Sequence, residues 1–116
     1  MSYEYKFLIA LFLTLLSEVP VVFCILRYVY KNNELKTSLI LFVSILASIL
    51  TLPYLWFVLP SFGFSRMVFV LLGESIVILV EMLIYFELLN LKLSKAFVLS
   101  LVANIASIIV GLIIKI

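Results

Sequence analysis

Glu18, Glu74 and Glu81 lie in the interior of long apolar stretches of this 116-residue chain, and Glu87 lies near the end of one. A charged side chain at the centre of a bilayer costs roughly 2.5 kcal/mol or more, so an acid in such a stretch is by default a functional hypothesis. A buried carboxyl group without a cationic partner favours its protonated form, and two close carboxyl groups titrate as a coupled pair. These residues could therefore hold a proton, a bound cation or a cationic substrate.

Polar residues in other apolar stretches reach the same depth as these acids. Counted from the side of the turns near residues 31–34 and 90–94, Glu18 lies ~18 Å deep, Glu81 ~15 Å and Asn104 ~12 Å, at 1.5 Å per helical residue. Ser48 falls in the same layer, and Tyr85 lies one helical turn from Glu81. The spacing predicts one buried polar cluster near mid-membrane, made of Glu18, Ser48, Glu81 and Asn104 and flanked by Glu74 and Tyr85.

A simpler interpretation needs no ligand. Protonated Glu18 and Glu81 can stabilise the bundle by hydrogen-bonding between helices, and Asn104 is a common residue for such bonds. Glu74 is closer to one end of its stretch, where it can be merely solvated. The sequence leaves both interpretations open.

The elements that must position these residues are four apolar helices. Hydrophobic residues make up 67% of the chain and charged residues 12%, far from the balance of a soluble domain. The apolar runs cover about 6–30, 35–59, 65–91 and 95–114, each long enough to cross a bilayer. The turns between them are short, so consecutive helices must be antiparallel neighbours. We predict an all-α, four-helix transmembrane bundle with up-down topology, forming a single domain over residues 1–116.

Two further patterns concern how the helices bend and pack. Pro20 and Pro53 lie inside the first two apolar runs, where proline removes a helical hydrogen bond and is expected to kink the helix. Ala103, Ser107 and Gly111 repeat at four-residue spacing, a series that lets a neighbouring backbone approach closely. Because one bundle of four helices leaves little room for a solute path, we expect a homodimer or a larger membrane complex, with this series as a candidate interface.

The composition also excludes several classes of function. There is no histidine and only one cysteine, Cys24, which excludes His/Cys zinc sites and Cys/His nucleophilic catalysis. The net charge of +2 is scattered, so nucleic acid is not an expected partner. No nucleophile, phosphate cradle or cofactor motif accompanies the acids, so we expect neither an enzyme nor a cofactor. A metal ligand set cannot be named from these residues.

Basic residues give the expected orientation in the membrane. Five lie on the side of the turns near 31–34 and 90–94, and three lie on the other side. Because positive residues concentrate in the cytoplasm, these two turns are expected to be cytoplasmic. The two sets are Arg27, Lys31, Lys36, Lys92 and Lys95 against Lys6, Arg66 and Lys115.

Two resemblances accompany these patterns. The four helices with a glutamate in the middle of the first resemble the small multidrug resistance exporters in architecture alone, because the tryptophan and glycine pattern of their third helix is missing. Several longer phrases are similar to a group of uncharacterised small four-helix prokaryotic membrane proteins. That resemblance implies a multi-pass protein of a prokaryotic cell membrane and adds no activity. The phrases are Glu18-Val-Pro20, 51–60, Gly73-Glu74, Glu81 with Tyr85, and 100–107 with Gly111.

Two functional hypotheses follow. The first is a small transporter or ion-conducting protein that sits in the lipid bilayer and uses Glu18 and Glu81 as a proton or cation site. The second is a structural or assembly subunit of a larger membrane complex, whose polar faces would meet partner helices. Purification as a discrete oligomer without a partner would favour the first.

Overall fold

The computed structural model describes residues 2–63 and 65–114, and over these residues the fold is all-helical, without strands. The four main helices are α1 (Tyr3–Cys24), α2 (Thr37–Pro53), α3 (Arg66–Leu88) and α4 (Leu93–Ile114). Four helical segments in these ranges are long and apolar enough to cross a membrane. The predicted fold class, a four-helix bundle, is therefore confirmed. Lys115, which entered the charge count, lies outside the described residues.

Shorter helical segments extend the first two helices. A π-helix, η1 (Ile25–Val29), continues α1, and a second π-helix, η2 (Tyr54–Val58), continues α2 directly after Pro53. A short 3-10 helix, η3 (Leu59–Phe62), then ends at Gly63, whose φ of 71° suits a residue without a Cβ. α1 itself continues through Pro20 to Cys24. The chain thus changes its winding five residues after Pro20 and immediately after Pro53.

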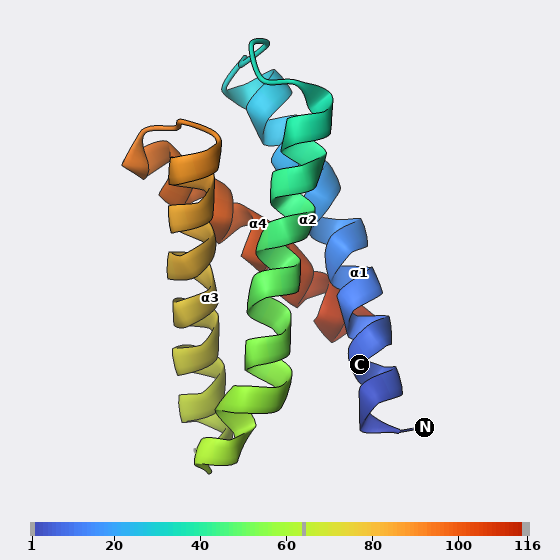
Figure 1. The fold of residues 1–116 in the computed structure, drawn as a ribbon. Helices are drawn as coiled ribbons and strands as arrows, with labels where there is room; N and C mark the ends of the chain where they lie inside the picture. Colours follow the sequence, from blue (N-terminus) through green and yellow to red (C-terminus); the bar gives the residue numbers. More distant parts are fainter. Residues whose placement is uncertain (1, 64, 115–116) are drawn as a thin grey trace.

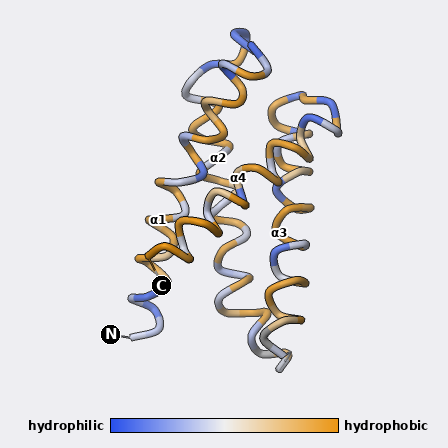
Figure 2. The backbone as a smooth tube through the Cα atoms, turned by 180° about the vertical axis from the view of Figure 1, so that it is seen from behind, coloured by the Kyte–Doolittle hydropathy of each residue, from blue (hydrophilic) through white to orange (hydrophobic). Residues whose placement is uncertain are grey.

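The helices run alternately up and down, and α4 crosses the others at an angle. It begins beside α3 and ends near the start of α1, as the two opposite views show (Figures 1 and 2). α4 therefore packs extensively on both α1 and α3, while α2 packs on α1 and α3 from the other side. Hydrophobic residues cover most of the helices, and hydrophilic residues gather mainly at the turns (Figure 2).

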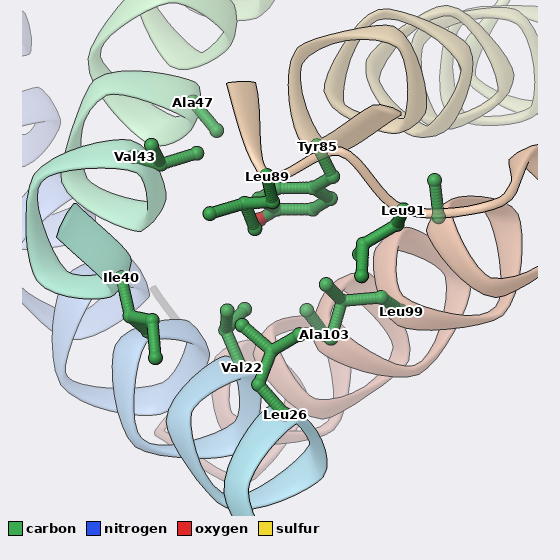
Figure 3. Close-up of a cluster of buried hydrophobic side chains, with 11 residues drawn as sticks. Val22, Leu26, Ile40, Val43, Ala47, Tyr85, Leu89, Leu91, Leu99 and Ala103 are labelled. Carbon is green, nitrogen blue, oxygen red and sulfur yellow. The ribbon is translucent and has the colours of Figure 1, made fainter. Parts of the chain in front are cut away.

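The interior of the bundle has two unlike halves. The half towards loop 1 (residues 30–36) and loop 3 (residues 89–92) is filled by a cluster of buried side chains, which we call the apolar cluster (Figure 3). The half towards Gly63 and the chain termini contains a cavity instead. The boundary between the halves lies at the level of the buried acids. The apolar cluster consists of Val22, Leu26, Ile40, Val43, Ala47, Tyr85, Leu89, Leu91, Ala96, Leu99 and Ala103.

Aromatic and close-packed contacts hold the cavity end together. Tyr3 donates a hydrogen bond to the backbone carbonyl of Trp56 at 2.6 Å, and its ring lies 5.1 Å from that indole. Phe7 packs edge-on against Phe57, with the ring centroids 4.8 Å apart. On the other side of η2, a Cβ on Gly73 would lie only 2.5 Å from a methyl group of Leu55. These contacts tie η2 to both α1 and α3.

Arg27 organises loop 1 at the opposite end. Its guanidinium donates to the carbonyl of Asn32 at 2.6 Å, to the carbonyl of Leu35, and to the Thr37 hydroxyl at 3.2 Å. A planar group with several donors in a fixed fork suits such a set of acceptors. The arginine therefore joins the end of the first span to the start of the second.

Candidate functional site

Glu81 is the centre of the buried polar cluster. It lies on α3 with 1% of its side chain exposed, and both of its carboxyl oxygens have partners from other helices. The Asn104 amide of α4 donates to Oε1 at 2.8 Å, and the Thr51 hydroxyl of α2 lies 2.9 Å from Oε2. The carboxyl group thus connects three helices at one level.

The Thr51 hydroxyl can serve either protonation state of Glu81. Its oxygen also lies 2.8 Å from the carbonyl of Ala47, one turn back on α2. A hydroxyl has one hydrogen, so it can donate to only one of these acceptors at a time. When Glu81 is ionised, Thr51 donates to the carboxylate; when Glu81 is protonated, it can donate to Thr51, which then donates to Ala47. The site accommodates gain or loss of a proton without moving a heavy atom.

Glu18 reaches the same level from α1. Its side chain is 2% exposed, and its carboxyl group lies close to the carboxyl group of Glu81 and to the Ser107 hydroxyl. Its Oε1 atom has no hydrogen-bond partner among the described residues. The two acids therefore differ, because Glu81 is supported on both oxygens whereas Glu18 keeps one oxygen free.

The structure places the remaining predicted residues around this pair. Ser48 and Tyr85 are buried, but their hydroxyl oxygens have no hydrogen-bond partner among the described residues. Glu74 is half-buried and lines the cavity. It lies about two turns of α3 from Glu81, towards the chain termini. Glu18, Glu81 and Asn104 thus lie together, whereas Glu74 stands to one side.

The small residues of α4 face the inside of this bundle. Ala103 belongs to the apolar cluster, and Ser107 and Gly111 line the cavity. A Cβ on Gly111 would meet nothing within 4 Å, so no neighbouring backbone approaches it closely among the described residues. The close approach in this fold is at Gly73 instead, against the side chains of Leu55 and Leu59.

The cavity gives the acids a way to the surroundings. It has a volume of about 260 Å³, and all four spans contribute to its wall. Glu18 and Glu81 lie at its inner end, Glu74 along its side, and Trp56 near its outer end. No lysine or arginine lines it in the described part of the chain. A cavity with three carboxyl groups and no basic residue suits a proton or a positively charged ligand.

Two partners of the cluster were not singled out from the sequence. Thr51 shares the small, polar face of α2 with Ser44 and Ser48, but nothing in the sequence marks it as the residue that meets Glu81. Ser100 receives an Asn104 hydrogen bond on its carbonyl at 2.8 Å, and its hydroxyl donates to the carbonyl of Ile78 on α3 at 2.7 Å. These bonds orient the Asn104 amide towards Glu81.

The fold and the site together define a class: a small multi-pass α-helical membrane protein with a buried carboxyl group, Glu81, hydrogen-bonded between its helices. Comparison with protein-family models, with curated proteins and with solved structures finds no match to this chain. The functional argument therefore depends on the geometry of the site.

Proposed function

We propose that this protein is a small membrane transporter or ion-binding protein that holds a proton or a cation at Glu18 and Glu81. The observation that carries the proposal is the pair itself, two buried carboxyl groups side by side at the inner end of a cavity that no basic residue lines in the described chain. Two carboxylates this close and this buried cannot both remain ionised without a counter-charge, so the pair shares a proton or binds a cation.

The unequal support of the two acids suggests how the pair works. Asn104 and Thr51 can both donate to a Glu81 carboxylate, which stabilises its ionised form. Glu18 has one oxygen without a partner among the described residues and is the better site for the exchangeable proton or ligand. Exchange with the surroundings takes place through the cavity, which both acids line.

Thermal unfolding of the purified protein in detergent tests this proposal. A ligand that binds only the folded state raises the melting temperature, so wild type should respond to pH between 5 and 9 or to added cations. Glu81→Gln and Glu18→Gln should abolish that response. Glu87→Gln is the matched control, because Glu87 lies on the same helix as Glu81 and is exposed. Equal responses in wild type and both glutamine variants would refute the proposal.

The half of the bundle that contains the cavity also favours the second candidate, an assembly subunit. The cavity is not enclosed by the four spans, so a helix of a partner could pack against its polar wall. In that case the protein should be monodisperse only with a co-purifying partner. A discrete homodimer or larger homo-oligomer that forms without one would support the transporter instead. In either case we expect loops 1 and 3 in the cytoplasm, which cysteine labelling from each side of the membrane can check.

A further inference from the structure

Three buried side-chain oxygens lack a hydrogen-bond partner in the described structure: Glu18 Oε1, Ser48 Oγ and Tyr85 Oη. Their side chains are 2%, 1% and 0% exposed, and they come from α1, α2 and α3. Leaving one buried polar group unpaired costs about 1–3 kcal/mol, and folded proteins leave few such groups. Three of them beside one polar cluster therefore need an explanation.

The three groups lie within about one helical turn of one another along the bundle. Ser48 is one turn from Thr51 in the direction of loop 1, and Tyr85 is one turn from Glu81 in the direction of loop 3. Because Thr51 and Glu81 are in contact, both hydroxyl-bearing residues lie ~5 Å beyond that contact, on the same side. Glu18 lies next to Glu81, and its carboxyl group is close enough to Tyr85 to act on that hydroxyl electrostatically. Glu18 lines the cavity and Tyr85 belongs to the apolar cluster, so the three groups lie where the cavity and the cluster meet.

Packing alone does not account for these hydroxyl groups. The Tyr85 ring reaches from α3 into the middle of the apolar cluster (Figure 3), where a phenylalanine would fill the same space without an unpaired hydroxyl. Ser44 is as buried as Ser48 and lies one turn away on the same helix. Its hydroxyl donates to the Ile40 carbonyl at 2.6 Å, as serines in apolar helices commonly do. Ser48 makes no such bond.

We propose that Glu18, Ser48 and Tyr85 form a binding site for a dehydrated monovalent cation of the sodium class. This inference rests on the proposed function and names its ligand. All three groups offer oxygen atoms, which are the ligands that hard cations prefer. One monovalent cation neutralises the charge that Glu18 gains when it loses its proton, so the net charge of the buried site does not change. The described residues hold no cluster of three or more acidic, histidine or cysteine side chains suited to a metal ion, as a divalent site would need.

The cation takes the place of the Glu18 proton. Binding converts the Glu18 carboxylic acid to a carboxylate paired with the cation, and one proton leaves through the cavity. The titratable groups that face Glu18 are all on α3, namely Glu74, Glu81 and Tyr85. α2 and α4 face it with hydroxyl and amide groups, which do not titrate. The apparent affinity for the cation should therefore increase with pH until Glu18 is fully ionised.

The experiment uses the full chain in detergent, with sodium chloride replaced by choline chloride at constant ionic strength. Sodium should raise the melting temperature of wild type and of Ser44→Ala, the matched control. Ser48→Ala and Tyr85→Phe should bind sodium at least tenfold more weakly. A pH-indicating dye provides a second readout, because wild type should release one proton per bound sodium ion, and Tyr85→Phe should release far less at the same sodium concentration.

Three results would overturn the inference. If Ser48→Ala and Tyr85→Phe respond to sodium as wild type does, the hydroxyl groups take no part in binding. If lithium, sodium and potassium all leave wild type unchanged while a pH response is lost in Glu81→Gln, the proton site stands and the cation site is wrong. If wild type responds neither to pH nor to any cation, the proposed function is wrong as well.

Discussion

The hydrogen bond between Asn104 and Glu81 should become stronger as pH rises. The bond is 2.8 Å long, is buried, and joins α4 to α3. A hydrogen bond to a charged group contributes ~1.5–3 kcal/mol, whereas interhelical hydrogen bonds between neutral groups in membranes average ~0.6 kcal/mol. Ionisation of Glu81 increases with pH, so the coupling between the two side chains should rise from ~0.6 to ~1.5 kcal/mol or more.

A double-mutant cycle measures this coupling. The free energy of unfolding is determined by titration with a denaturing detergent in mixed micelles, for wild type, Asn104→Ala, Glu81→Ala and the double variant. The cycle cancels the energetic cost of the space left by Asn104→Ala, because that space is present with and without the Glu81 carboxyl. Repeating it at several pH values separates the neutral from the ionised state.

A matched control and two contrary outcomes complete the test. Ser44→Ala combined with Glu81→Ala should show coupling near zero, because the Ser44 hydroxyl donates to Ile40 on its own helix. A coupling that stays near the neutral value at every pH would show that Glu81 does not ionise in the folded protein. A coupling of zero between Asn104 and Glu81 would refute the contact itself.

Three other changes probe the frame around the site. Gly73→Ala should alter the free energy of unfolding by less than ~1 kcal/mol. The higher helix propensity of alanine offsets the crowding of Leu55, whose side chain can turn into the cavity. A loss above ~3 kcal/mol would contradict this. Tyr3→Phe should cost ~0.5–1.5 kcal/mol and change the emission of Trp56, the only tryptophan, because the 2.6 Å bond is lost while the rings stay packed. Arg27→Lys should speed amide hydrogen exchange over 31–36 and leave the helices protected, since lysine cannot reach several acceptors at once; unchanged exchange would show that the loop holds itself.

The sequence predicts the fold and the level of the site because both depend on spacing along the chain. Apolar runs of spanning length fix the number of helices, short turns make them antiparallel, and the rise per residue then places Glu18, Glu81 and Asn104 at similar depths. Depth alone does not say which residue of a helix faces inward. That depends on rotation about the helix axis, which packing decides, so Thr51 could not be distinguished from Ser44 or Ser48 as the partner of Glu81.

Other features left no trace in the spacing. The π-helices over Ile25–Val29 and Tyr54–Val58 change the phase of the residues after them, and no periodic pattern marks their start. The tilt of α4 results from its packing on α1 and α3, which again depends on tertiary contacts. The small-residue series on α4 predicts a close helix contact, and no such signal in the sequence marks Gly73, where a Cβ would meet the side chains of Leu55 and Leu59.

The unequal halves of the interior determine where the membrane voltage acts. An electric field falls mainly across the insulating part of its path, and the apolar cluster is that part, because the cavity lined by the three carboxyl groups reaches from the opposite end to the level of Glu18 and Glu81. Moving one elementary charge through a full membrane potential of 100 mV involves ~2.3 kcal/mol. A charge that travels between the cavity and Glu18 would sense only a small share of this energy. Nearly all of the electrical work would be done on a charge that moves between the acids and loops 1 and 3, past the ring of Tyr85.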